Sequence, residues 1–95
     1  MQNILYVYIL LCENGAYYTG YTTHLERRFQ QHLQGTAKCK FTQSFKHIKI
    51  AQHWKIYGDK SMAMKIEKYI KTLKKSEKEH IILYPDVLER LFLTQ

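Results

Sequence analysis

Long apolar runs are missing from this chain. The longest, Ile4 to Cys12, is far shorter than the roughly 20 residues that a membrane-spanning helix needs. We therefore expect neither a spanning helix nor a signal peptide. Cysteine is scarce as well: Cys12 and Cys39 form no C-x-x-C pair and are too few for a disulfide scaffold. Both are expected to be free thiols in a reducing compartment, which predicts a cytoplasmic protein without membrane association.

Internal repeats, low-complexity tracts and linkers are also absent, so residues 1–95 are expected to form one domain. Acidic residues are missing between Arg27 and Gly58. Over the whole chain 15 Lys and Arg stand against 8 Asp and Glu, which gives a net charge of +7. This polarised charge favours a polyanionic partner such as a nucleic acid.

The first structural signal is a hairpin around Asn14-Gly15. Residues 4–11 lack polar alternation, which is typical of a central strand covered on both faces, and residues 16–20 form the natural return strand. A two-residue loop would place Leu11 opposite Tyr18. A three-residue loop, with Gly15 left-handed, places Leu10 opposite Tyr18 and makes Tyr8 its diagonal neighbour about 7 Å away. We predict the three-residue loop.

A helix follows the hairpin. Thr23 and Glu26 have the spacing of a capping box, which predicts a start near Thr23. Arg28 and His32 fall at the edge of the expected buried stripe, and Arg27 points away from it. The stripe consists of apolar residues that recur every four positions: Leu25, Phe29 and Leu33.

The rest of the chain completes a mixed fold. Residues 35–45 are polar and basic and are expected to form a loop that contacts a ligand. Residues 47–56 alternate as a third strand with one wet face, and we expect no bulge at Gln52 because the alternation keeps its phase there. A helix over residues 61–75 follows. Ser76 and Glu79 predict a capping box for the next helix, Pro85 ends or interrupts it, and residues 86–93 form a last short helix.

These elements predict an α+β fold. Its core is a three-stranded antiparallel sheet flanked by helices, in the order β-β-α-β-α-α with a possible extra C-terminal helix.

Five positions resemble the signature of the GIY-YIG domain, in particular its small stand-alone bacterial members. Tyr6-Val7-Tyr8 stands where the family has Gly-Ile-Tyr, and Tyr18-Thr19-Gly20 stands where it has Tyr-Ile-Gly. Arg28, His32 and Glu67 match the family's arginine, histidine and metal-binding glutamate. The resemblance covers residues 5–78, which leaves residues 79–95 as a C-terminal helical extension.

The resemblance implies a metal-dependent phosphodiester hydrolase, an endonuclease acting on DNA in repair or recombination. Glu67 would hold Mg²⁺ or Mn²⁺, and Arg28 would donate to the phosphate. Either Tyr8 or Tyr18 would take a proton from the attacking water, and His32 would orient a tyrosine or relay a proton. Because no recognition domain is appended, cutting is expected to follow DNA structure and not sequence. We expect a monomer that prefers DNA to RNA and binds it through Arg28, Lys38, Lys40, Thr42 and Lys71.

Simpler interpretations exist for each residue. Tyr8 and Tyr18 are also explained as core tyrosines, and Glu67 as the partner of Lys71 in a surface i,i+4 pair. The chain has no late asparagine like that of some family members, and it has Gln43 where small bacterial relatives tend to have arginine. These departures leave two alternatives: a non-catalytic nucleic-acid-binding module, or a protein-interaction domain that uses the apolar tail over residues 87–93.

Overall fold

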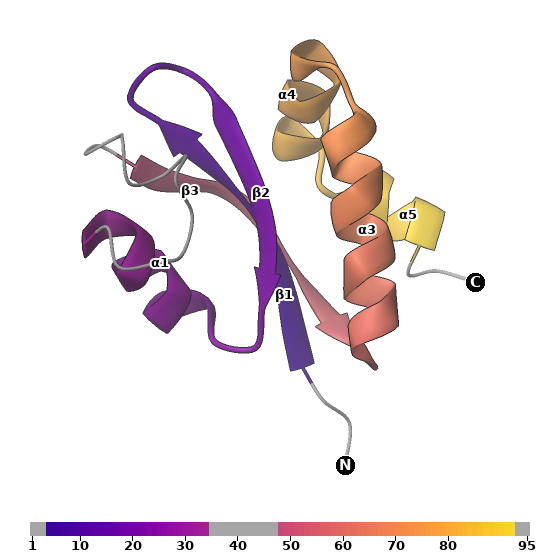
Figure 1. The fold of residues 1–95 in the computed structure, drawn as a ribbon. Coiled ribbons are helices and arrows are strands. Elements are labelled where there is room, and N and C mark those ends of the chain that lie inside the picture. The colour runs from indigo at the N-terminus through magenta and orange to yellow at the C-terminus, as the bar shows by residue number, and fades with distance from the viewer. Residues whose placement is uncertain (1–3, 35–47, 93–95) are drawn as a thin grey trace.

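The computed structural model describes residues 4–34 and 48–92 (Figure 1). Its sheet is three-stranded and antiparallel, and four helices accompany it within those ranges, so the predicted fold class is confirmed. The segment predicted to contact a ligand, with Lys38, Lys40 and Thr42, lies outside the described residues. In chain order the elements are β1 (Ile4–Cys12), β2 (Tyr17–Thr22), α1 (Leu25–Gln34), β3 (Ile48–Tyr57), α3 (Lys60–Thr72), α4 (Lys75–Leu83) and α5 (Asp86–Phe92).

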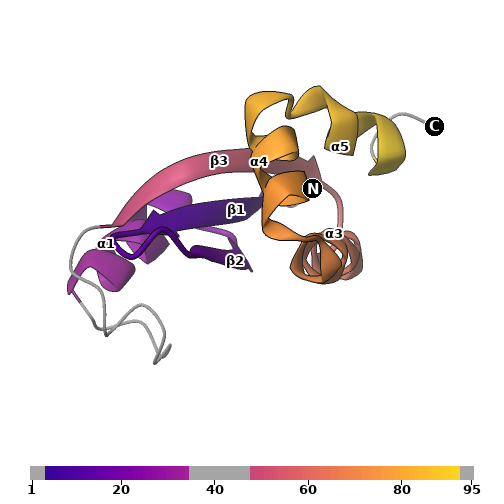
Figure 2. The same ribbon diagram turned by 90° about the horizontal axis from the view of Figure 1, so that it is seen from above.

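The sheet lies between two helical layers. Its strand order is β2-β1-β3, with α1 on one face and α3, α4 and α5 on the other (Figures 1 and 2). β1 is therefore central and buried on both sides, which explains its continuous apolar sequence. Its residues Leu5, Val7 and Ile9 belong to the core under α3, whereas Tyr8 and Leu10 belong to a smaller core under α1. No helix among the described residues is long and apolar enough to cross a membrane.

The hairpin between β1 and β2 has the predicted three-residue loop. Leu10 pairs with Tyr18, and the backbone N–H of Cys12 donates to the carbonyl of Ala16 at 2.9 Å. Gly15 has a φ of +85°, a left-handed conformation that glycine adopts without a steric penalty. The register puts Tyr8 and Tyr18 on the same face of the sheet, as the odd loop length requires.

β3 contains a bulge, so the prediction of an uninterrupted strand at Gln52 is wrong. Ile9 pairs with Gln52 but Leu10 pairs with Ile50, which leaves Ala51 as the extra residue. Ile50 consequently packs with the core under α1, while Gln52 faces the α3 layer beside Ile9. Because helices cover both faces of the sheet, apolar residues continue at the same sequence parity across the bulge and conceal it.

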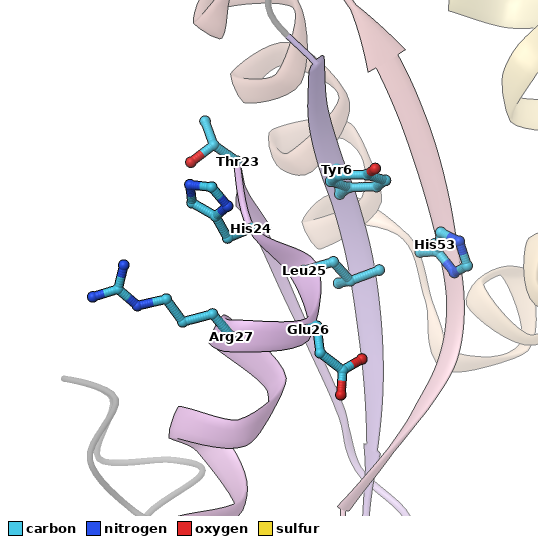
Figure 3. Close-up of a pocket in the computed structure, with 7 residues that line it drawn as sticks. All are labelled: Tyr6, Thr23, His24, Leu25, Glu26, Arg27 and His53. Carbon is cyan, nitrogen blue, oxygen red and sulfur yellow. The ribbon is translucent and has the colours of Figure 1, made fainter.

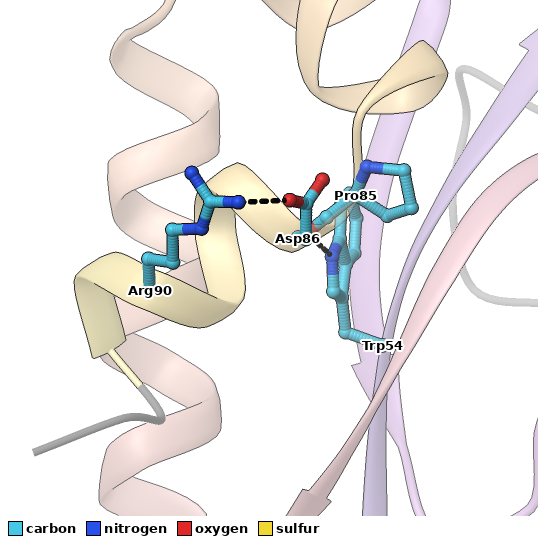
Figure 4. Close-up of polar contacts among 4 residues, drawn as sticks. All are labelled: Trp54, Pro85, Asp86 and Arg90. Atoms are coloured by element: carbon cyan, nitrogen blue, oxygen red, sulfur yellow. Dashed lines mark hydrogen bonds and ion pairs between the residues drawn. The ribbon is translucent and has the colours of Figure 1, made fainter.

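Two side chains of β3 form hydrogen bonds that hold the C-terminal helices against the sheet. The Gln52 side-chain amide donates to the carbonyl of Ile82 at 2.9 Å. The Trp54 indole N–H donates to the carbonyl of Pro85, also at 2.9 Å (Figure 4). Trp54 is buried, so its donor has a partner as expected for buried polar groups. An ion pair between Asp86 and Arg90 at 2.8 Å lies on the surface of α5.

Neither capping box forms at the predicted residues. α1 begins at Leu25, two residues later than expected, and the Thr22 hydroxyl accepts from the backbone N–H of His24 at 3.2 Å. α4 begins at Lys75, so Ser76 lies inside it. The carboxylate of Glu77, not that of Glu79, binds the preceding backbone by accepting from the N–H of Lys74 at 2.9 Å. Neighbouring glutamates compete for this role, and sequence alone does not rank them.

Candidate active site

A buried pair of polar side chains joins β1 to α1. The Tyr8 hydroxyl lies 3.0 Å from Nε2 of His32, and both residues are only 2 % exposed. Leu25 and Phe29 pack around the same small core. Leu33, which the helical spacing assigned to the buried stripe, is 37 % exposed. His32 is the buried residue of α1 instead, with its imidazole directed toward the sheet and hydrogen-bonded to Tyr8.

Gly20 leaves the space that the Tyr8 ring occupies. The two residues are paired in the β1–β2 register. A Cβ atom at Gly20 would lie 2.6 Å from the Tyr8 hydroxyl oxygen and 2.8 Å from Cζ, closer than real Cβ contacts come. The glycine therefore lets the Tyr8 ring lie flat over β2 and reach α1.

Tyr18 completes a cluster of three rings. Its ring centroid lies 5.1 Å from that of His32 and 6.5 Å from that of Tyr8. Tyr18 is half-buried, so it is the accessible phenol of the pair. The next residue, Thr19, is buried on the opposite face of the sheet, and its hydroxyl has no hydrogen-bond partner among the described residues.

Arg28 sets the electrostatic environment of His32. Burial lowers the pKa of the His32 imidazole, and the positive charge of Arg28 one turn earlier lowers it further. The ring is therefore neutral at pH 7. Arg28 also lines an open hollow of about 280 Å³ together with Thr22, Thr23, His24, Arg27 and Gln31.

Glu67 lies in the other helical layer. It belongs to α3, which packs over β1 and β2 on the face opposite α1 (Figure 1). Its side chain is 17 % exposed, one turn after the fully buried Ala63, and it forms an ion pair with Lys71 at 3.0 Å. The structure thus gathers Tyr8, Tyr18 and His32 beside Arg28, but separates Glu67 from them by the thickness of the sheet.

Comparison with known proteins gives a consistent result. The family model described as the GIY-YIG catalytic domain matches residues 4–80. The chain belongs to this family. It is 36 % identical over 77 residues to a UPF0213 protein of Halalkalibacterium halodurans, which covers 81 % of this chain and 80 % of the relative. A UPF0213 protein of Natronomonas pharaonis is 38 % identical over 77 residues, covering 81 % and 88 %.

A solved structure supports the same conclusion. The solution NMR structure of the UPF0213 protein from Bacillus halodurans has a TM-score of 0.55 and 34 % identity to this chain. The match covers 85 % of this chain and 84 % of that one. The relatives are therefore small proteins of about this size, as the resemblance in sequence predicted.

GIY-YIG nucleases generally depend on a divalent metal, and the donors in this chain can be compared with that requirement. Within residues 4–34 and 48–92 no group of three His, Cys, Asp or Glu could hold an ion. Glu67 offers a single carboxylate. Mg²⁺ usually binds through one or two carboxylates together with waters and substrate phosphates. The donor set therefore fits an ion that is shared with substrate, and does not fit a resident structural ion.

The same face of this GIY-YIG domain carries a second hollow that sequence reasoning missed. It has a volume of about 690 Å³ and lies between the start of α1 and strands β1 and β3 (Figure 3). Two features of the sequence could have indicated it. Tyr6 lies two residues before Tyr8 and so faces the same side of the sheet, and His53 is one of the polar residues that alternate along β3. Its lining consists of Tyr6, Thr23, His24, Leu25, Glu26, Arg27 and His53.

Proposed function

We propose that this GIY-YIG domain is a metal-dependent endonuclease that cuts DNA phosphodiesters by structure and not by sequence, with a role in DNA repair or recombination. The observation that supports it is the ring cluster of Tyr8, Tyr18 and His32 beside the hollow that contains Arg28. Family membership supports nucleic-acid hydrolysis in general. The assignments of individual residues rest on the geometry.

The hollow with Arg28 is suited to a phosphate. Its lining includes Arg27 and Arg28 and contains no carboxylate, so it favours an anion. Neither arginine forms an ion pair with another described residue. A planar guanidinium donates two parallel hydrogen bonds to a phosphate and holds it in one orientation. Arg28 therefore binds the scissile phosphate and stabilises the negative charge that develops on it.

Tyr18 acts as the general base. Tyr8 is buried and its hydroxyl is engaged by His32, so an attacking water reaches Tyr18 more readily. A free phenol titrates near pH 10, and a nearby cation favours the phenolate. Arg28 supplies such a charge on this face of the sheet. The neutral imidazole of His32, whose ring centroid lies 5.1 Å from that of Tyr18, orients the phenol.

Glu67 would hold the divalent ion, Mg²⁺ or Mn²⁺, in the α3 layer. There the ion would supply positive charge to a DNA phosphate and to a leaving oxygen that come within its reach. β2 is an edge strand, and Tyr18 and Glu67 lie on its two sides. A DNA strand that crosses this edge meets the phenol on one face and the carboxylate on the other. Lys71, bound to Glu67, also lies near this path and contacts the DNA backbone.

Cleavage assays test the proposal. We expect labelled flap, fork, hairpin and single-stranded DNA to be cut with Mg²⁺ or Mn²⁺ and to stay intact with chelator. Glu67→Gln and Arg28→Ala abolish cutting. Asp86→Asn and Arg90→Ala are matched controls, because they break the i,i+4 ion pair of α5 far from the ring cluster. Cutting that survives in both site variants indicates a contaminating nuclease and contradicts the proposal.

A non-catalytic nucleic-acid-binding module is the second candidate. It is favoured by the position of Glu67 across the sheet from Tyr18. Such a module binds duplex DNA with a log-log salt slope of about −0.9 for each phosphate that it neutralises. It also binds equally well after Glu67→Gln and cuts nothing in the presence of metal, which separates it from the nuclease.

A protein-interaction domain is the third candidate, and the C-terminal tail supports it only in part. Leu88 is fully buried in the main core, and Val87 and Phe92 pack against that core. Leu91 is exposed, as are Leu83 and Tyr84 on the neighbouring segment. Size that rises with concentration in scattering, together with no shift of nucleic acid in a gel, would favour this candidate over the expected monomeric nuclease.

A further inference from the structure

We infer that the hollow between α1 and strands β1 and β3, here called the base pocket, binds one unpaired nucleobase next to the phosphate held by Arg28. The inference rests on the proposed function and adds the class of substrate: nucleic acid with a single-stranded nucleotide at the site. The base pocket is defined by its lining residues Tyr6, Thr23, His24, Leu25, Glu26, Arg27 and His53 (Figure 3).

Two aromatic rings form one corner of the base pocket. The ring centroids of Tyr6 and His53 lie 6.3 Å apart, and their planes are inclined by 57°. A base that stacks face-on against one ring therefore meets the edge of the other, as aromatic groups prefer. Leu25 lies beside Tyr6 and adds an apolar surface (Figure 3). His53 is exposed and Tyr6 is half-buried, so both rings are accessible to a base.

The base pocket adjoins the ring cluster of the proposed active site. Tyr6 precedes Tyr8 by two residues on β1, so the side chains share a face and are separated by about 7 Å along the strand. His53 is the β3 partner of Tyr8 in the sheet register. A nucleotide in the base pocket is therefore a direct neighbour of the phosphate at Arg28.

The two hollows differ in the charged residues that line them, which suits one to a base and the other to a phosphate. In the base pocket the carboxylate of Glu26 offsets the charge of Arg27, which makes this pocket less favourable to a phosphate than to a neutral base. The hollow with Arg28 contains no carboxylate. The two share Thr23, His24 and Arg27, so they adjoin at the start of α1. One sugar–phosphate unit with its base thus spans both, base toward Tyr6 and phosphate toward Arg28.

Such a pocket selects against intact duplex. A base inside a duplex is paired and stacked, and its faces are not accessible to protein rings unless it is extruded. Aromatic stacking also tolerates any base, because every base has a π-face. The arrangement therefore favours structure-guided recognition, in which flaps, frays and single strands supply the free base.

Binding measurements with chelator present test the inference without cleavage. The probes are a single-stranded DNA containing 2-aminopurine and the corresponding intact DNA duplex. We expect wild-type protein to quench 2-aminopurine in the single strand. His53→Ala and Tyr6→Leu should weaken single-strand binding by about 5- to 150-fold and remove the quenching, while duplex binding stays unchanged. Tyr6→Phe retains the ring and should retain both.

Tyr57→Leu is the matched control, because Tyr57 is an exposed aromatic of β3 outside the base pocket. Three results overturn the inference: ring variants that bind single strands as wild type does, equal losses on single strand and duplex, or the same loss in Tyr57→Leu. In each case, metal-dependent cutting abolished by Glu67→Gln would leave the proposed function standing. A wild-type protein that neither binds nor cuts nucleic acid overturns both.

Discussion

The hydroxyl of Tyr8 and Nε2 of His32 lie 3.0 Å apart, at a contact between sheet and helix from which solvent is excluded. The two signature residues of this GIY-YIG domain thus serve first as structural partners. The hydrogen bond joins two buried polar groups, so it helps to fix the position of α1 on β1. Arg28, one turn away on the same helix, is positioned by this contact, and so would be the phosphate that we propose it binds.

Exchanging each tyrosine for phenylalanine should separate structure from chemistry. Tyr8→Phe removes the partner of a buried imidazole and should lower the free energy of unfolding by about 1–3 kcal/mol. Tyr18→Phe removes the proposed base and should lower the cleavage rate by about 10²- to 10⁴-fold while the protein stays folded. Chemical denaturation and single-turnover cleavage measure the two effects. Cleavage that is lost with Tyr8→Phe and retained with Tyr18→Phe would reverse the assignment.

His32 should make the domain sensitive to acid. Its pKa in the folded protein is lower than the ordinary value near 6.5, because of burial and the charge of Arg28. Protons therefore bind the unfolded state more tightly. The stabilisation is fully present above about pH 6.5 and is lost as pH falls through the folded pKa, by at most about 1.4 kcal/mol per pH unit for one proton.

Denaturation at several pH values, with NMR titration of the imidazole, measures this dependence. Arg28→Gln removes the repelling charge and should raise the pKa of His32, which makes the loss in acid smaller. His53→Ala, which removes an exposed histidine, is the control for histidine substitution in general. An acid-induced loss that is the same in wild type and Arg28→Gln would contradict the electrostatic part of this account.

Gly20→Ala should disturb the ring cluster without changing any polar group. The added methyl would lie 2.6 Å from the Tyr8 hydroxyl oxygen, which is held by His32 and cannot move freely. Overpacking of this kind typically costs about 1–3 kcal/mol. A double-mutant cycle with Tyr8→Ala measures the contact directly: Gly20→Ala should be much less destabilising when the ring is absent. Additive effects of the two substitutions would show that the glycine has another role.

The hairpin could be predicted from the sequence because the length of its loop fixes which residues pair. The parity of the hairpin loop predicted the pairing of Leu10 with Tyr18, and Gly15 at its left-handed position confirmed it. The bulge at Ala51 was not predictable from the alternation of polar and apolar residues. Because helices cover both faces of the sheet, apolar residues occur on both faces and do not show which face a residue of β3 points to. His32 was expected at the edge of a stripe and is buried, since a hydrogen bond to Tyr8 compensates for its polarity.

The candidate site was predictable only in part, for a related reason. Four of the candidate residues belong to the hairpin and the helix that follows it, so they stay close in space: Tyr8, Tyr18, Arg28 and His32. Glu67 comes after β3, and sequence order does not indicate which face its helix covers. The structure places α3 on the opposite face, which changes how the carboxylate can meet DNA.

The ion pair between Glu67 and Lys71 therefore gives a direct test of the metal proposal. The ammonium lies 3.0 Å from the carboxylate and competes with any cation for it. Lys71→Gln removes this competition and should lower the Mn²⁺ concentration needed for half-maximal binding, which calorimetry measures on the protein without DNA. Stability should change by about 1 kcal/mol or less, because the Lys71 side chain is 54 % exposed and solvent screens the pair.

The same variant reports on the proposed DNA contact of Lys71. If its ammonium neutralises one phosphate, the salt slope of duplex binding should become shallower by about 0.9 in Lys71→Gln. Lys68→Gln, an exposed neighbour on α3 without a carboxylate partner among the described residues, is the control for general charge. Unchanged Mn²⁺ binding in Lys71→Gln would mean that Glu67 is not a metal ligand. The ion pair alone would then account for the carboxylate, and the non-catalytic module would become the better interpretation.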